Sequence, residues 1–175
     1  MARILIAYST VDGHTLNICL RMEEVLAAQG HEVVLASLDT EPQLDPEPFD
    51  KVVVGASIRY GKHRPAVYDF AARNRAILEA KPNALFSVNL VARKPGRDLP
   101  ERNPYLRRFL GQITWRPQLL AVFAGKLDYP RYSFWDRQVI RLIMWITHGP
   151  TDPAAVVEYT DWGKVEAFAE RVARL

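Results

Sequence analysis

Cysteine is almost absent from this chain of 175 residues, with Cys19 as its single example. One cysteine excludes an internal disulfide and provides no thiolate cluster for zinc, so we expect a reducing compartment and no metal site. Long apolar runs are also missing, because runs such as residues 142–146 are far below the ~20 residues that span a bilayer. The apolar run at residues 3–8 is too short for a signal peptide. We therefore expect a cytoplasmic protein that can lie on a membrane without crossing it.

The chain also has little net charge, +3, but its charge is unevenly distributed. Residues 93–148 hold 11 Lys and Arg against 4 Asp and Glu, a local charge of +7. The remaining residues hold 12 against 16, a charge of −4. The basic segment is rich in Trp, Tyr, Phe, Leu and Ile, which argues against a disordered basic tail. The pattern indicates a folded body that carries one basic surface for an anionic ligand or membrane.

Short apolar runs alternate with helical patterns along the whole chain. Uniformly apolar strands separated by helices are typical of a parallel sheet that is covered on both faces. We expect an α/β fold, a doubly wound three-layer sandwich over residues 1–175 with a helical insertion at 126–150. The expected strands are residues 3–8, 32–38, 51–57, 82–90 and 118–125. The expected helices are residues 15–29, 66–80, 101–113 and 138–148, with a last helix capped by Asp161.

The loop after the first strand combines hydroxyl groups with a glycine at the start of a helix. It reads Ser9-Thr10-Val11-Asp12-Gly13-His14-Thr15, and the free N–H groups and dipole of a helix N-terminus favour an anion. The loop lacks the motifs of nucleoside-triphosphate and dinucleotide sites. An ordinary capped helix is the alternative.

This loop resembles the phosphate loop of flavodoxins, which hold the phosphate of FMN. It departs from them at Asp12, where flavodoxins usually have threonine. A carboxylate repels phosphate, so we expect Asp12 to turn outward or to cap the helix. We expect His14 to contribute its backbone N–H rather than its imidazole.

Three more strand ends carry polar residues at the same edge of the sheet, where such folds bind ligands. In flavodoxin-like proteins the loop after the third strand packs against the flavin ring, and here Tyr60 can stack on it. Asn89 offers the donors and acceptor that a flavin pyrimidine edge requires. Polar strand ends at the surface, with no ligand, are the alternative. The expected cofactor-binding residues are Ser9, Thr10, Val11, Asp12, Gly13, His14, Thr15, Ala56, Ser57, Ile58, Arg59, Tyr60, Gly61, Ser87, Val88, Asn89, Leu90, Gly125, Lys126, Leu127 and Tyr129.

The segment after the fifth strand combines aromatic residues, arginines and a broad apolar arc. Arg137 and Arg141 share one face of its expected helix at i, i+4. Such a helix suits the membrane interface. Packing on the core, contact with a second subunit or a pocket above the flavin would also suit it. No nucleic-acid module is present, so we exclude that partner.

Motifs spread over nearly the full chain resemble the bacterial flavodoxin-type, quinone-dependent protoporphyrinogen IX oxidases. The segment Tyr129-Pro130-Arg131-Tyr132 with its following helix is the most distinctive of them. The others are Ser9-Thr10-x-Asp12-Gly13, Ala56-Ser57-Ile58-Arg59-Tyr60-Gly61-Lys62, Lys94-Pro95-Gly96-Arg97, Asn103-Pro104-Tyr105, Phe123-Ala124-Gly125 and Tyr159-Thr160-Asp161-Trp162.

This resemblance implies a flavodoxin-like sheet of strand order 2-1-3-4-5 and FMN as cofactor. It also implies oxidation of protoporphyrinogen IX to protoporphyrin IX in haem biosynthesis, with menaquinone or ubiquinone as acceptor. The protein would then associate peripherally with the inner face of the cell membrane, as a monomer or a homo-oligomer. The residues expected to hold propionates or lipid phosphates are Arg59, Lys62, Arg93, Lys94, Arg97 and Arg131. Further expected contacts with substrate or membrane are Trp135, Arg137 and Arg141.

No catalytic base is evident from the sequence. Arg59 and His63 are the only candidates, and an exposed structural histidine is the alternative for His63. A flavodoxin-type electron carrier would need an acidic docking face, which the basic loops argue against. An FMN-dependent NAD(P)H:quinone reductase and a membrane-bound scaffold without a cofactor are two further candidate functions.

Overall fold

A parallel sheet forms the centre of the computed structural model, which describes all residues 1–175. Its strands follow the order β2-β1-β3-β5-β6. This confirms the predicted order, because the additional strand β4 (Lys62–His63) is only a short antiparallel partner of β3. The parallel strands are β1 (Arg3–Ser9), β2 (Glu32–Ser37), β3 (Lys51–Arg59), β5 (Asn83–Asn89) and β6 (Leu119–Ala124).

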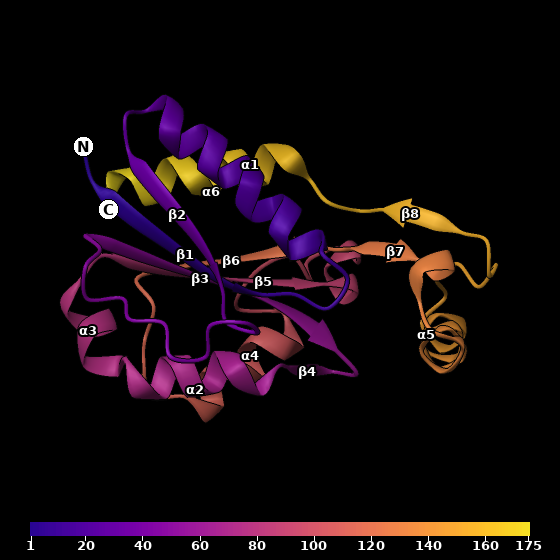
Figure 1. The fold of residues 1–175 in the computed structure, drawn as a ribbon. Helices are drawn as coiled ribbons and strands as arrows, with labels where there is room; N and C mark the ends of the chain where they lie inside the picture. Colours follow the sequence, from indigo (N-terminus) through magenta and orange to yellow (C-terminus); the bar gives the residue numbers. More distant parts are fainter.

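Helices cover both faces of this sheet and make three layers (Figure 1). One face carries α1 (His14–Ala28) and α6 (Trp162–Arg174). The other carries α2 (Pro65–Arg73), α3 (Arg75–Ala80) and α4 (Pro104–Gln112). Successive residues of a strand point to opposite faces, so Ile4 and Ile6 pack under the first pair whereas Leu5 packs under the second set.

Capping residues set two helix boundaries that the sequence pattern placed differently. The helix expected at 66–80 is divided at Asn74, whose side chain donates to the Phe70 carbonyl at 3.1 Å and competes with the helix. The helix expected at 101–113 begins only at Pro104, because Asn103 accepts from the N–H groups of Tyr105 and Leu106.

The segment after β6 forms its own small unit beyond the carboxyl ends of the strands (Figure 1). It consists of β7 (Lys126–Asp128), the 3₁₀ turn η2 (Tyr129–Arg131), α5 (Phe134–Ile146) and β8 (Val156–Glu158), with β7 and β8 antiparallel. Its helix starts earlier than predicted because the Ser133 hydroxyl caps it. β8 lies beyond the expected insertion 126–150. None of the helices in the structure combines the length and hydropathy that a membrane span requires.

Candidate functional site

A cavity opens at the carboxyl ends of the strands, between the sheet and α5. It encloses about 970 Å³ including its open mouth. The walls come from the α1 loop, the β3–β4 turn, the turn η1 (Leu90–Arg93) after β5, and α5. Its predicted lining residues are Thr10, Val11, Asp12, His14, Thr15, Ser57, Ile58, Arg59, Tyr60, Gly61, Val88, Asn89, Leu90, Arg93, Gly125 and Lys126.

The loop before α1 forms the polar end of the cavity. Gly13 adopts φ 85°, a conformation that glycine tolerates, and its N–H donates to the Thr10 hydroxyl at 3.0 Å. No side chain caps α1, which leaves its first N–H groups available to an anion. Ser9 does not line the cavity, contrary to the prediction. Its buried hydroxyl donates to Asp39 at 3.0 Å beneath the loop.

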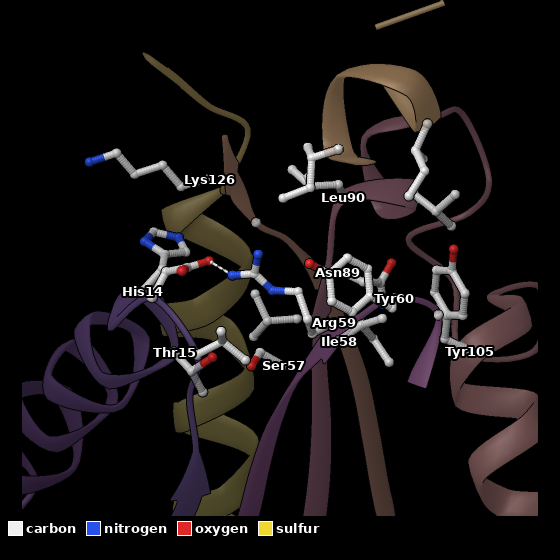
Figure 2. Close-up of a pocket in the computed structure, with 18 of the residues that line it drawn as sticks. His14, Thr15, Ser57, Ile58, Arg59, Tyr60, Asn89, Leu90, Tyr105 and Lys126 are labelled. Atoms are coloured by element: carbon white, nitrogen blue, oxygen red, sulfur yellow. Dashed lines mark hydrogen bonds and ion pairs between the residues drawn. The ribbon is translucent and has the colours of Figure 1, made fainter. Parts of the chain in front are cut away.

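Buried polar atoms without a partner gather around this cavity. They are Thr15 Oγ1, Ser57 Oγ, His14 Nδ1 and one terminal nitrogen of Arg59, and all four residues line it (Figure 2). Buried polar groups in folded proteins normally have a hydrogen-bond partner. Hydroxyl groups, a guanidinium and a helix N-terminus form a donor set that fits the phosphate and polyhydroxyl chain of FMN.

Arg59 occupies the middle of the cavity and lies between His14 and Tyr60 (Figure 2). Its guanidinium donates to Asp12 at 2.5 Å and has a second carboxylate, Asp136 of α5, at 3.8 Å. It also lies over the ring of Tyr132, 5.2 Å from the centroid. Asp12 does not cap α1, in contrast to one of its two expected roles; it lines the cavity, is partly exposed and pairs with Arg59.

The β3–β4 turn presents an aromatic ring at the cavity. Tyr60 and Gly61 both have positive φ, 50° and 76°, as a two-residue hairpin of type I′ requires. Tyr60 is strained there because non-glycine residues rarely adopt this conformation. Its ring is 51% exposed and is available for stacking on a flat ligand.

The Asn89 side chain bonds to the protein, contrary to its predicted role at a pyrimidine edge. Its amide donates to Ser87 and to Asn103, and its oxygen accepts from Asn103 and from the Ala92 N–H. These bonds use its donors and acceptor, so Asn89 shapes the turn after β5.

His63 belongs to the same buried network and is not exposed. Its Nε2 lies 2.9 Å from the Ser87 hydroxyl, and burial lowers the pKa of its imidazole to about 4. The ring is therefore neutral at physiological pH. It does not line the cavity, which argues against His63 as a catalytic base.

α5 supplies an apolar wall that the sequence interpretation missed. Ile140, Ile143, Met144 and Thr147 line the cavity, and their spacing of three, one and three residues is the helical signal that marks them. The other missed lining residues are Val91, Tyr105 and Tyr132.

Three arginines predicted to bind substrate or lipid instead hold the insertion together. Arg137 donates to the Tyr129 carbonyl at 3.2 Å, and Arg141 donates to the Thr151 carbonyl at 2.8 Å. Arg93 donates to the Leu90 carbonyl at 2.9 Å and to the Thr147 hydroxyl at 3.1 Å. Of the three, only Arg93 also lines the cavity.

The remaining predicted residues lie outside the cavity wall. Lys62, Arg97, Arg131 and Trp135 are exposed and Lys94 is partly exposed. Those behind the wall are Ala56, Ser87, Leu127 and Tyr129, whereas Gly13 is partly exposed in the α1 loop. Leu127 and Tyr129 are fully buried in the small core of the insertion and are thus structural.

The outer face of α5 carries a continuous set of exposed apolar side chains. Trp135 is 77% exposed and Trp145 is 71% exposed. Large apolar residues on a free helix face indicate an interaction surface. The set consists of Phe134, Trp135, Val139, Leu142, Trp145 and Ile146, with Ile143 at its border with the cavity.

A family model described as a flavodoxin domain matches residues 5–154 of the chain. A short-chain flavodoxin associated with a non-canonical PDU bacterial microcompartment is 14% identical with a TM-score of 0.57, covering 99% of this chain and 98% of its own. Oxidised Flavodoxin 1 from Bacillus cereus is also 14% identical, with a TM-score of 0.56, covering 98% of this chain and 97% of its own. At this identity the two structures show the shared fold alone.

Two relatives are more similar in sequence. The protoporphyrinogen IX dehydrogenase (quinone) of Escherichia coli strain K12 is 42% identical over 173 residues, which cover 99% of this chain and 96% of that protein. The protein of the same name from Leishmania major is 40% identical, covering 99% of this chain and 75% of that protein. The chain therefore belongs to the flavodoxin-domain family and, within it, to the family of the protoporphyrinogen IX dehydrogenases (quinone).

Proposed function

We propose that this protein uses FMN to oxidise protoporphyrinogen IX to protoporphyrin IX and passes the electrons to a quinone. The oxidation removes six electrons and six hydrogens from the porphyrinogen and reduces three quinones to quinols. The observation that carries the proposal is the composition of one cavity: a polar end at the α1 loop and an apolar wall from α5. This cavity occurs in a chain that is 42% identical to a protein of that name.

The polar end would hold the cofactor. The hydroxyls of Thr10, Thr15 and Ser57 and the N-terminus of α1 form its donor set. Tyr60 would pack on the flat ring system. When bound, FMN accepts two electrons at a time and supplies the redox chemistry that no side chain here can perform.

The remaining wall suits a flat, apolar substrate with carboxylates. Ile140, Ile143 and Met144 give it an apolar surface, whereas Arg59 and Lys126 offer cations at its edge. The terminal nitrogen of Arg59 that faces Asp136 at 3.8 Å has no hydrogen-bond partner in the protein and could meet a propionate. These side chains orient the substrate against the cofactor, and we assign no side chain of the wall as its base.

The outer face of α5 would rest on an anionic membrane surface, the source of the quinone. Its apolar side chains include two tryptophans, which favour the membrane interface. The nearby segment 93–148 carries a charge of +7, which attracts anionic lipid head groups. We propose a peripheral location at the inner face of the cell membrane on these grounds.

Anaerobic reduction of the FMN-loaded protein tests the function directly. We expect protoporphyrinogen IX to bleach the flavin absorbance and a short-chain quinone to restore it, with fluorescent protoporphyrin IX as product. NAD(P)H provides the comparison, because a nicotinamide-dependent quinone reductase would be bleached by it instead. Bleaching by NAD(P)H alone would overturn the proposal, as would a protein that takes up no FMN.

A further inference from the structure

His14, the first residue of α1, has an imidazole whose tautomer follows from its neighbours. Its Nε2 lies 2.6 Å from the Thr160 hydroxyl oxygen. That hydroxyl donates its only hydrogen to the Ala124 carbonyl at 2.7 Å, so its oxygen must accept from His14. Nε2 therefore carries a hydrogen, and Nδ1 is the ring nitrogen without one in the neutral form.

Nδ1 of His14 has no partner in the protein although it is buried. The adjacent Thr15 hydroxyl is also unpartnered, and that residue is only 1% exposed. Both residues line the cavity at the N-terminus of α1. The edge of Trp162 packs against the His14 ring, with the centroids 6.0 Å apart, and limits its rotation. Two fixed polar groups thus lack a partner at the place where the helix favours an anion.

Charged groups around His14 act on its protonation in opposite directions. Lys126 of β7 disfavours a proton on the ring, whereas Glu158 of β8 favours one and itself accepts from the Trp162 indole at 2.9 Å. Asp12 in the same loop is paired with Arg59 of β3. Burial is the largest effect and lowers the pKa of His14 below its usual range. The ring is consequently neutral at pH 7 without a ligand.

We propose that His14 binds the cofactor phosphate as an imidazolium cation and takes up one proton from solvent when FMN binds. The proton goes to Nδ1, which then donates to a phosphate oxygen, while Nε2 keeps its bond to Thr160. This inference rests on the proposed function in one respect, that FMN binds with its phosphate at α1. A dianion beside the ring reverses the effect of burial and favours the charged form.

The sign of the resulting pH dependence follows from linkage. The pKa of His14 is low in the free protein and higher in the FMN complex. At pH values between these two, the complex holds one more proton than the free protein does. FMN affinity therefore falls as pH rises through that window. The phosphate of FMN is itself a dianion above about pH 6, so pH 6.5 to 8.5 isolates the histidine.

Calorimetry and flavin fluorescence quenching test this without any turnover. At pH 7.5, heats measured in buffers of different ionisation enthalpy should show proton uptake with FMN and none with riboflavin, which lacks the phosphate. His14→Gln keeps a polar side chain but cannot titrate. We expect it to weaken FMN binding by about tenfold at pH 6.5, less at pH 8.5, and to leave riboflavin binding unchanged. His31→Gln, which removes a histidine outside the cavity, is the matched control.

Three outcomes are decisive. Equal pH profiles for wild type and His14→Gln, together with no proton uptake by the wild type, would overturn the inference. An affinity that falls toward acid pH for both FMN and riboflavin would also overturn it. Nδ1 of the neutral His14 ring would then accept a hydrogen bond from a hydroxyl of the sugar-like chain that both ligands share. Failure of the wild type to bind FMN would instead contradict the proposed function.

Discussion

The positive charge of Arg59 lies close to two carboxylates at this cavity. The side chain is only 15% exposed and serves two carboxylates, one from the α1 loop and one from α5. Removing a paired charge leaves its partner uncompensated, so such pairs constrain the groups around them. Arg59 thereby links the phosphate loop to the insertion and makes a carboxylate tolerable beside an anion site.

Asp12→Asn should strengthen FMN binding. The change removes a negative charge near the phosphate and frees Arg59 to attract it, and the half-exposed position limits the gain to about two- to fivefold in Kd. Fluorescence quenching at low ionic strength measures the effect, which added salt should reduce. Glu170→Gln makes the same charge change outside the cavity and should leave Kd unaltered. Unchanged or weaker binding by Asp12→Asn would contradict this role of the ion pair.

At the scale of elements, the strands could be predicted because their signal is local. β1, β3 and β5 have apolar centres, and residues alternate to opposite faces whatever surrounds them. The helix boundaries were harder, because Asn74 and Asn103 act through side-chain bonds that composition does not reveal.

The loops that form the candidate site could be predicted from the sequence, but the contacts of their side chains could not. The carboxyl ends of parallel strands meet at one edge, so the α1 loop and the β3–β4 turn came together as expected. Asn89 and Arg137 bind other protein groups, and a residue type alone does not distinguish such a bond from one to a ligand. The wall formed by α5 depends on how the insertion folds back.

Arg93→Met should loosen α5 while leaving the sheet intact. Arg93 joins η1 to the end of α5 through the carbonyl and the hydroxyl of Thr147, and bonds to a charged group contribute about 1.5–3 kcal/mol. Hydrogen exchange in residues 134–149 should accelerate about tenfold or more, with little change in β1 or β5. Arg97→Met, which removes an exposed arginine of the same loop, is the control. Unaltered hydrogen exchange in α5 would contradict the prediction that Arg93 holds this helix in place, and would limit Arg93 to binding a ligand in the cavity.

Across the whole molecule, the largest group of exposed apolar side chains lies on α5, beyond the carboxyl ends of the strands (Figure 1). The sheet and its helices form a body with two ordinary cores, whereas the insertion adds a third, small core whose helix has cavity-lining residues on one side and exposed apolar residues on the other. α5 therefore contributes both to the cavity wall and to the exposed apolar surface. A membrane contact through α5 would bring a lipid-soluble acceptor to the cavity without a spanning segment.

Vesicle binding tests this arrangement. Wild type should cosediment with vesicles that contain anionic phosphatidylglycerol and bind neutral phosphatidylcholine vesicles more weakly, with a loss at high salt. The double change Trp135→Ser and Trp145→Ser should reduce binding at least about tenfold, because each buried indole contributes more than about 1 kcal/mol. Leu20→Ser removes an exposed apolar residue of α1 and should bind as wild type does. If α5 instead joins two copies of the chain, sedimentation equilibrium would show a dimer that the double change dissociates, and wild type would not bind the vesicles.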